Sequence, residues 1–122
     1  MTRPRSFNCG LGPALRVIAG KWKPTILWEV HAAPIRFREL HRRVSGISEK
    51  VLYEQLREME ADGIVRRRDL SGRTRHVEYS ATTIGASLNA AVHALAQWGT
   101  RYAAVSEERC RALAGDDARA RD

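Results

Sequence analysis

The chain has 122 residues, a formal net charge of +7 and a pI of about 10.2. A chain of this length is expected to form one domain, and its 43% of hydrophobic residues suffice for a modest core. The N-terminus lacks the apolar segment of a signal peptide, and no apolar run approaches the roughly 20 residues that cross a bilayer, so we expect a cytoplasmic protein without a membrane contact.

The positive charge is concentrated in the first two thirds of the chain. Residues 1–80 hold 16 basic and 9 acidic side chains, whereas residues 81–122 hold 5 of each. A charge that served only solubility would be spread evenly. The asymmetry therefore favours a polyanionic partner for the first part of the chain.

Residues 1–9 are polar and basic, and they are predicted to form an N-terminal arm. The first helix is expected to run from Leu11 or Pro13 to Ala19 and to stop at Gly20. Its partly buried residues are predicted to be Leu15, Val17 and Ile18.

Two further helices are predicted in the next part of the chain. The first has Pro24 in its first turn, where a missing backbone donor is harmless, and it ends at Pro34. The second runs from Arg36 to Arg43 and has one apolar face. The residues of these two helices that are predicted to face the core are Ile26, Leu27, Val30, Phe37, Leu40 and Val44.

The fourth predicted helix lies between Gly46 and Gly63. Ser48 is a good N-cap, and Gly63 can adopt the left-handed conformation that ends helices. Its apolar stripe is Leu52, Leu56 and Met59, and the opposite polar face is free to touch a partner. Only four or five residues join this helix to the preceding one, which is typical of a helix-turn-helix.

A β hairpin is predicted after Gly63, with Ser71-Gly72 as its turn and with Arg73 and Arg75 at or just beyond its tip. A helix-turn-helix followed by a basic hairpin is a winged helix. In such folds the recognition helix enters the major groove, and the hairpin lies over the backbone or the minor groove. The predicted fold class is mainly α with a small β hairpin, in a winged helix-turn-helix domain with a C-terminal dimerisation helix.

A last long helix is predicted after the hairpin, with Thr82 as its N-cap. Gly99 can interrupt this helix. Because its apolar stripe continues beyond a compact winged domain, a second copy of the chain is the natural partner, although the stripe could instead complete the monomer's core. The domain with its dimerisation helices is assigned to residues 10–113, and the frayed sequence from Ala114 onward predicts a disordered tail over residues 114–122. The predicted dimer interface is Leu88, Val92, Leu95, Trp98 and Tyr102.

A series of short motifs runs through the chain in a fixed order. They are Cys9, Gly20-Lys21-Trp22, Ile26-Leu27, Arg36-Phe37-Arg38-Glu39-Leu40, Gly46-Ile47-Ser48, Lys50, Leu52, Leu56-Arg57-Glu58, Asp62-Gly63, Val77-Glu78-Tyr79, Thr82, Gly85, Leu88 and Trp98-Gly99. Together they resemble the HxlR-type winged helix-turn-helix transcriptional regulators, which are related to the MarR regulators. The resemblance covers about residues 9–99, and it departs from the family pattern mainly at Ala81, at Met59 and in a wing without its frequent proline.

The resemblance implies a homodimer that binds a near-palindromic operator in double-stranded DNA. We expect a repressor, although the sequence itself does not distinguish repression from activation. Lys50 or Arg57 can donate to guanine edges, and Arg73 and Arg75 suit phosphates or a narrow minor groove. Glu49 would repel the backbone unless it accepts from cytosine or disfavours wrong sites. The candidate DNA-binding residues are Arg36, Arg38, Ser48, Glu49, Lys50, Tyr53, Arg57, Arg73 and Arg75.

Cys9 is the candidate sensor of an oxidant or electrophile. Nearby cations and a following helix N-terminus both raise the thiolate content of a cysteine. The resemblance supports this role, because several family members sense oxidants or reactive carbonyl compounds through an N-terminal cysteine at this place. The thiolate could be modified directly or pair with Cys110 of the partner subunit. Alternatively, Cys9 is a small packing residue.

Other function classes find less support. The four histidines, His31, His41, His76 and His93, have no repeated ligand spacing, and two distant cysteines are neither a zinc pattern nor a disulfide framework. We therefore expect no enzyme, no metal site and no cofactor. The alternative is a general nucleic-acid-binding or architectural protein without a chemical signal. A preference of at least roughly 10³-fold for one operator over random duplex separates the two.

Overall fold

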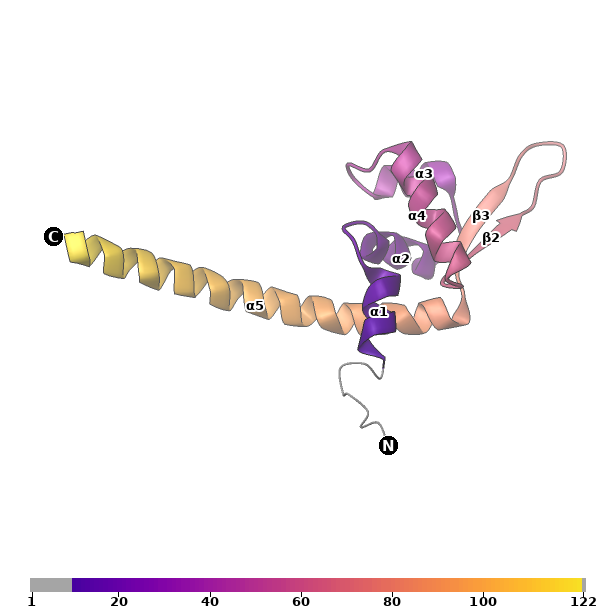
Figure 1. Ribbon diagram of the computed structural model, residues 1–122. Coiled ribbons are helices and arrows are strands. Elements are labelled where there is room, and N and C mark those ends of the chain that lie inside the picture. The colour runs from indigo at the N-terminus through magenta and orange to yellow at the C-terminus, as the bar shows by residue number, and fades with distance from the viewer. Residues whose placement is uncertain (1–9, 122) are drawn as a thin grey trace, which may run out of the picture. The chain divides into compact units, whose positions relative to one another are not determined.

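The computed structural model describes the backbone of residues 10–121 and the side chains of residues 10–115 (Figure 1). It is mainly helical with one small sheet, which confirms the predicted fold class. The chain divides into two compact units after Asn89. In chain order the elements are α1 (Leu11–Ile18), α2 (Lys23–Ala32), β1 (Ile35–Arg36), α3 (Phe37–Arg43), α4 (Glu49–Ala61), β2 (Val65–Asp69), β3 (Val77–Ala81) and α5 (Thr83–Arg121).

The core of the first unit lies between α2, α3, α4 and the sheet. Leu27, Leu40 and Leu52, one from each of these helices, are completely shielded from solvent. Full burial of each such aliphatic side chain stabilises the folded state by roughly 1.5–3 kcal/mol. The predicted stripe of α4 is buried, as are the predicted core residues of α2. The remaining buried apolar residues outside α2 and α4 are Ile35, Val44, Ile47, Ile64, Val65 and Tyr79.

Helix α4 begins and ends where the sequence predicts. The hydroxyl oxygen of Ser48 accepts a hydrogen bond from the backbone nitrogen of Val51 at 3.1 Å, as an N-cap does. After Asp62 the chain turns at Gly63, whose φ of 75° is accessible to glycine at little cost. Gly46, with a φ of 88°, makes the turn between α3 and α4, so the helix-turn-helix is confirmed.

The sheet has three antiparallel strands in the order β1-β3-β2. Strand β1 was not predicted, and the expectation that Arg36 starts the third helix was wrong. Arg36 is extended and pairs with Glu78, and Ile35 pairs with Tyr79. A two-residue strand is too short to show alternation, and its pairing partners lie more than 40 residues away, so no local pattern reveals it. The predicted hairpin is confirmed as β2 and β3.

Helix α1 matches its predicted limits within one residue, and Val17 and Ile18 are partly buried as expected. The expectation for Leu15 was wrong, because its side chain is 50% exposed. Leu11 is also exposed and lies one turn before Leu15, so the two leucines share a stripe that residues 10–115 leave open to solvent. The predicted arm over residues 1–9 lies outside the described residues.

Helix α5 begins after Thr82, whose hydroxyl oxygen accepts from the backbone nitrogen of Gly85 at 3.1 Å, as predicted for its cap. The helix continues through Gly99 and reaches Arg121, so the suggested interruption does not occur and the frayed segment from Ala114 is helical. A single glycine lowers helix stability by only about 1 kcal/mol, and the alanines and arginines around it favour helix. Although α5 has 39 residues, neither it nor any other helix in the described chain is long and apolar enough to cross a bilayer.

Candidate nucleic-acid interface

Helix α4 presents one continuous polar face to solvent. Glu49, Lys50, Tyr53, Glu54 and Arg57 are all exposed, because the opposite stripe of the helix is the one that packs. The guanidinium carbon of Arg57 lies 5.9 Å from the ring centroid of Tyr53, one turn earlier. This distance is within the range of a cation–π contact, so the ring of Tyr53 supports the Arg57 guanidinium on the exposed face of α4.

Two polar contacts anchor the ends of α4 to the rest of the unit. Near its beginning, a ring nitrogen of His41 in α3 lies 2.9 Å from the carbonyl oxygen of Ile47, and because a carbonyl only accepts, the histidine donates. Near its end, the ammonium of Lys23 in α2 pairs with the Glu58 carboxylate at 2.7 Å. Lys23 is only 8% exposed, so this pair compensates for a buried charge. The exposed face of α4 is therefore held in a fixed position.

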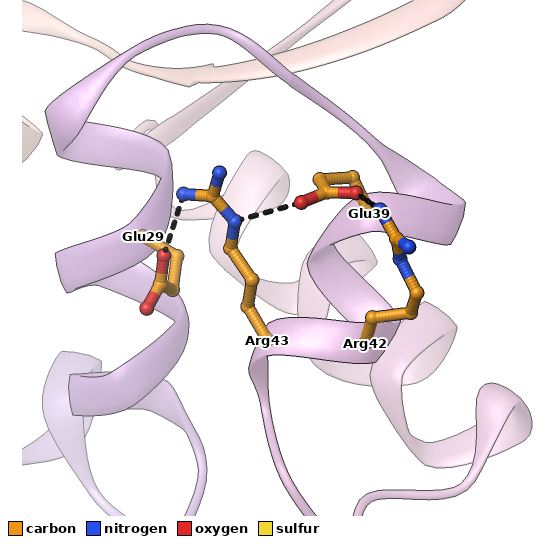
Figure 2. A network of polar contacts seen from close by, with 4 residues as sticks. All are labelled: Glu29, Glu39, Arg42 and Arg43. Atoms are coloured by element: carbon orange, nitrogen blue, oxygen red, sulfur yellow. Dashed lines mark hydrogen bonds and ion pairs between the residues drawn. The ribbon is translucent and has the colours of Figure 1, made fainter.

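Helix α3 carries arginines of two kinds. Figure 2 shows Arg43 between Glu29 of α2 and Glu39, and Arg42 beside Glu39. Arg43 pairs with Glu29 at 3.5 Å and with Glu39 at 3.0 Å, while Arg42 also pairs with Glu39. These acids partly neutralise Arg42 and Arg43 and tie α3 to α2. Arg38 is exposed and has no ion pair within the described residues, so its charge is available to a polyanion.

The hairpin of β2 and β3 forms the wing (Figure 1). Hydrogen bonds close its tip. The backbone nitrogen of Leu70 donates to the His76 carbonyl at 2.7 Å, and that of His76 donates to the Ser71 hydroxyl at 2.9 Å. Asp69 accepts from the Ser71 backbone at 2.9 Å. The side-chain and backbone hydrogen bonds from Ser71, helped by the charges of Arg67 and Arg75, hold the pKa of Asp69 below its ordinary value of 3.8. The tip thus presents Arg73 on a well-defined turn.

An open groove of about 830 Å³ separates α3 and the start of α4 from the base of the wing. Four arginines and two glutamates contribute to its walls, which gives it a net positive lining. The groove brings together four of the predicted DNA-binding residues, which come from β1, α3, α4 and the loop of the hairpin. It is lined by Arg36, Phe37, Arg38, Glu39, His41, Arg42, Glu49, Arg75 and Val77.

The other predicted site residues fall into separate groups. Ser48, Lys50, Tyr53 and Arg57 lie along α4, and Arg73 is exposed at the wing tip. Cys9 lies outside the described residues. Among the predicted dimer residues of α5, Leu88 and Val92 are half-buried, whereas the last three, Leu95, Trp98 and Tyr102, are each more than half exposed.

Sequence reasoning missed several residues of this surface. Arg66, Arg67 and Arg68 are all exposed on β2, and their run of charge was visible in the sequence but was not assigned to the site. Lys23 was missed as an anchor of α4. Its position beside the buried residues of α2 was a signal, but one sequence does not reveal its partner Glu58.

Comparison with known proteins identifies the kind of molecule that carries this surface. Residues 17–107 match the HxlR-like helix-turn-helix family. The chain is 40% identical over 99 residues, 81% of this chain and 84% of its relative, to the uncharacterized HTH-type transcriptional regulator YkvN of Bacillus subtilis.

Solved structures agree with this match. A structure described as a transcriptional regulator of the MarR family from Enterococcus faecalis superposes with a TM-score of 0.75 at 34% identity, covering 88% of this chain and 97% of that one. The redox regulator HypR in its reduced form gives a TM-score of 0.74 at 37% identity, covering 80% and 97%. The oxidized form of HypR superposes with a TM-score of 0.69 at 38% identity, covering 76% of this chain and 96% of that one. The chain is a winged helix-turn-helix transcriptional regulator of the HxlR-like family.

Proposed function

We propose that this regulator is a dimeric repressor that reads its operator with the exposed face of α4. The observation that carries the proposal is the combination of that exposed polar face with two anchors, Lys23–Glu58 and His41–Ile47, that fix the helix. A helix held this firmly can place side chains against base edges without first being ordered. Transcription regulation of this kind implies a cytoplasmic protein.

The residue types on the exposed face of α4 and on the wing support different roles in DNA binding. Lys50 and Arg57 donate to guanine edges, and Tyr53 supports the Arg57 guanidinium. Arg38 in the groove and Arg73 at the wing tip are suited to phosphates or to the minor groove. The hydroxyl oxygen of Ser48 is already used as the helix cap, so its remaining donor and the nearby backbone amides can meet a phosphate at the helix N-terminus.

The second copy of the chain is proposed to pack on α5. Apolar residues recur along this helix at alternating four- and three-residue spacing, which is the seam of a two-stranded coiled coil. Five of them are large and more than half exposed, and the rings of Trp98 and Tyr102 stack at 5.1 Å. The proposed seam consists of Ile84, Leu88, Ala91, Leu95, Trp98, Tyr102 and Val105. Val92, which was predicted for the interface, follows Ala91 and lies beside this spacing.

Cys9 is proposed as the residue through which this repressor senses an oxidant or electrophile. The likeness to HypR, which is named a redox regulator, supports the proposal, and Cys110 is an exposed thiol on α5 that could receive a disulfide from Cys9 of the partner subunit. The test compares operator affinity before and after diamide or a quinone. We expect the wild type to lose binding and Cys9→Ser to keep it. Loss of binding in Cys9→Ser, or none in the wild type, would make Cys9 structural. Cys110→Ser separates direct modification from an inter-subunit disulfide.

The alternative is an unselective nucleic-acid-binding protein. Selection of bound duplexes from a random pool decides between them. The proposal expects one near-palindromic sequence that is bound at least roughly 10³-fold more tightly than random duplex. Recovery of no consensus would favour the alternative.

A further inference from the structure

Strand β1 supports the wing over a very short distance. It pairs with β3 at only two positions, Ile35 with Tyr79 and Arg36 with Glu78. Beyond Glu78 the hairpin continues to its tip with β2 alone as its hydrogen-bonded neighbour strand. A two-stranded hairpin is only marginally stable by itself, so the distal part of the wing needs another contact to keep a fixed direction.

The side chain of Arg36 supplies such a contact. Its Nη2 donates to the backbone carbonyl of Arg75 at 2.9 Å, three residues beyond the last β1–β3 pair. Within the described residues, it is the one hydrogen bond that reaches residues 70–75 from outside the hairpin. The carbonyl belongs to the residue just before His76, whose backbone closes the tip by bonding Leu70 and Ser71. Arg36 therefore holds the wing at the base of its tip.

We propose that Arg36 is a positioning residue for the wing. By holding the Arg75 carbonyl it fixes the tip relative to α3 and α4, and it thereby sets where Arg73 meets the DNA flanking the major-groove contact. This inference rests on the proposed function for its consequence, but the geometry itself is a property of the free protein. A guanidinium suits the task, since one donor can hold the carbonyl while the others stay directed into the groove.

The first arm of the test needs no DNA. Backbone ¹⁵N relaxation of Arg36→Ala should lower the order parameters of residues 70–75 toward the roughly 0.6 of flexible backbone, while residues 78–80 stay rigid. Arg36→Lys, which keeps a donor and a charge, should restore much of the order. Arg38→Ala is the matched control, because Arg38 is an exposed neighbour without a bond to the wing, and it should leave the order parameters unchanged. Unchanged wing order in Arg36→Ala would overturn the proposal.

The second arm uses a double-mutant cycle on operator affinity. If Arg36 acts through the wing, Arg36→Ala should weaken binding by roughly 2- to 10-fold, the factor expected for one exposed hydrogen bond. The loss should be less than about twofold when Arg73→Ala has already removed the tip contact. The fold losses of operator affinity caused by Arg36→Ala and by Arg57→Ala should multiply in the double variant, because the two residues act independently.

Equal losses in both backgrounds would show that Arg36 contacts DNA directly and would overturn its positioning role. A wild type without sequence preference would refute the proposed function, whereas the order parameters of the free protein would still decide whether Arg36 holds the wing.

Discussion

The hydroxyl of Thr82 donates to the carbonyl of Gly63 at 2.6 Å, which joins the residue before α5 to the glycine that follows α4. The backbone nitrogen of Thr82 also donates to Ile64 at 3.0 Å. The proposed recognition helix and the proposed dimerisation helix thus share one hydrogen-bonded junction. Because these hydrogen bonds connect the two helices, we expect a substitution at the start of α5 to alter the backbone at the end of α4.

Gly85 makes this junction possible, since a Cβ at this position would lie 2.1 Å from the Ile64 carbonyl oxygen. We predict that Gly85→Ala destabilises the fold by about 1–3 kcal/mol, the usual range for overpacking. Gly12→Ala is the control, because Gly12 is also helical and has nothing within 4 Å, and it should raise stability by at most about 1 kcal/mol. Urea unfolding at matched protein concentration measures both. Equal stabilities of the two variants would refute the close approach.

Removing either partner of the Lys23–Glu58 pair should change the stability of the fold by different amounts. Glu58→Ala leaves a buried ammonium without its carboxylate and should cost on the order of 1–3 kcal/mol, less than the roughly 3–5 kcal/mol of a fully buried pair because Glu58 itself is 57% exposed. Lys23→Met removes the charge but keeps the packing and should be nearly neutral. Thermal unfolding compares the two. A larger loss of stability in Lys23→Met than in Glu58→Ala would mean that the ion pair itself stabilises the fold.

Asp69 at the wing gives a prediction for pH. Its carboxyl pKa is lowered chiefly by the Ser71 side-chain hydrogen bond, so Ser71→Ala should raise that pKa toward 3.8. Since the folded pKa lies below the unfolded one, the stabilisation is present above the unfolded pKa and is lost as the pH falls through the folded pKa. Carboxyl ¹³C titration by NMR follows the group directly. A wild-type pKa at or above 3.8 would contradict the described turn.

The proposed dimer predicts a response to charge on the seam of α5. Tyr102→Glu places a carboxylate among apolar residues and should give a folded monomer with little DNA affinity. Thr100→Glu adds the same charge at an exposed position off the seam and should stay dimeric. Light scattering at tens of micromolar reads the assembly state. A monomeric wild type, or a dimeric Tyr102→Glu, would refute this interface.

Features encoded by local patterns were predictable from the sequence. The stripe Leu52, Leu56 and Met59, the Ser48 cap and the left-handed Gly63 are set by residues within one or two helical turns, and all three are confirmed. The order of the motifs also indicated the family.

Features that depend on distant residues were not predictable. Strand β1, the Lys23–Glu58 pair and the bond from Arg36 to Arg75 join positions separated by more than 30 residues, and a single sequence carries no sign of which positions meet. Arg36 illustrates the consequence. Its charge placed it in the candidate site, but only the three-dimensional arrangement shows that its guanidinium bonds to the wing.

In the proposed function the exposed face of α4 reads the DNA sequence, and a comparison of two arginine variants tests this role most directly. Dissociation constants for the selected operator and for random duplex are measured at several salt concentrations for the wild type, Arg57→Ala and Arg73→Ala. Arg57→Ala should reduce the discrimination between the two duplexes by roughly 1–3 kcal/mol, whereas Arg73→Ala should weaken both about equally and lower the salt slope by about 1. An equal loss of discrimination in the two variants, or none in Arg57→Ala, would contradict the assignment of α4 as the recognition helix.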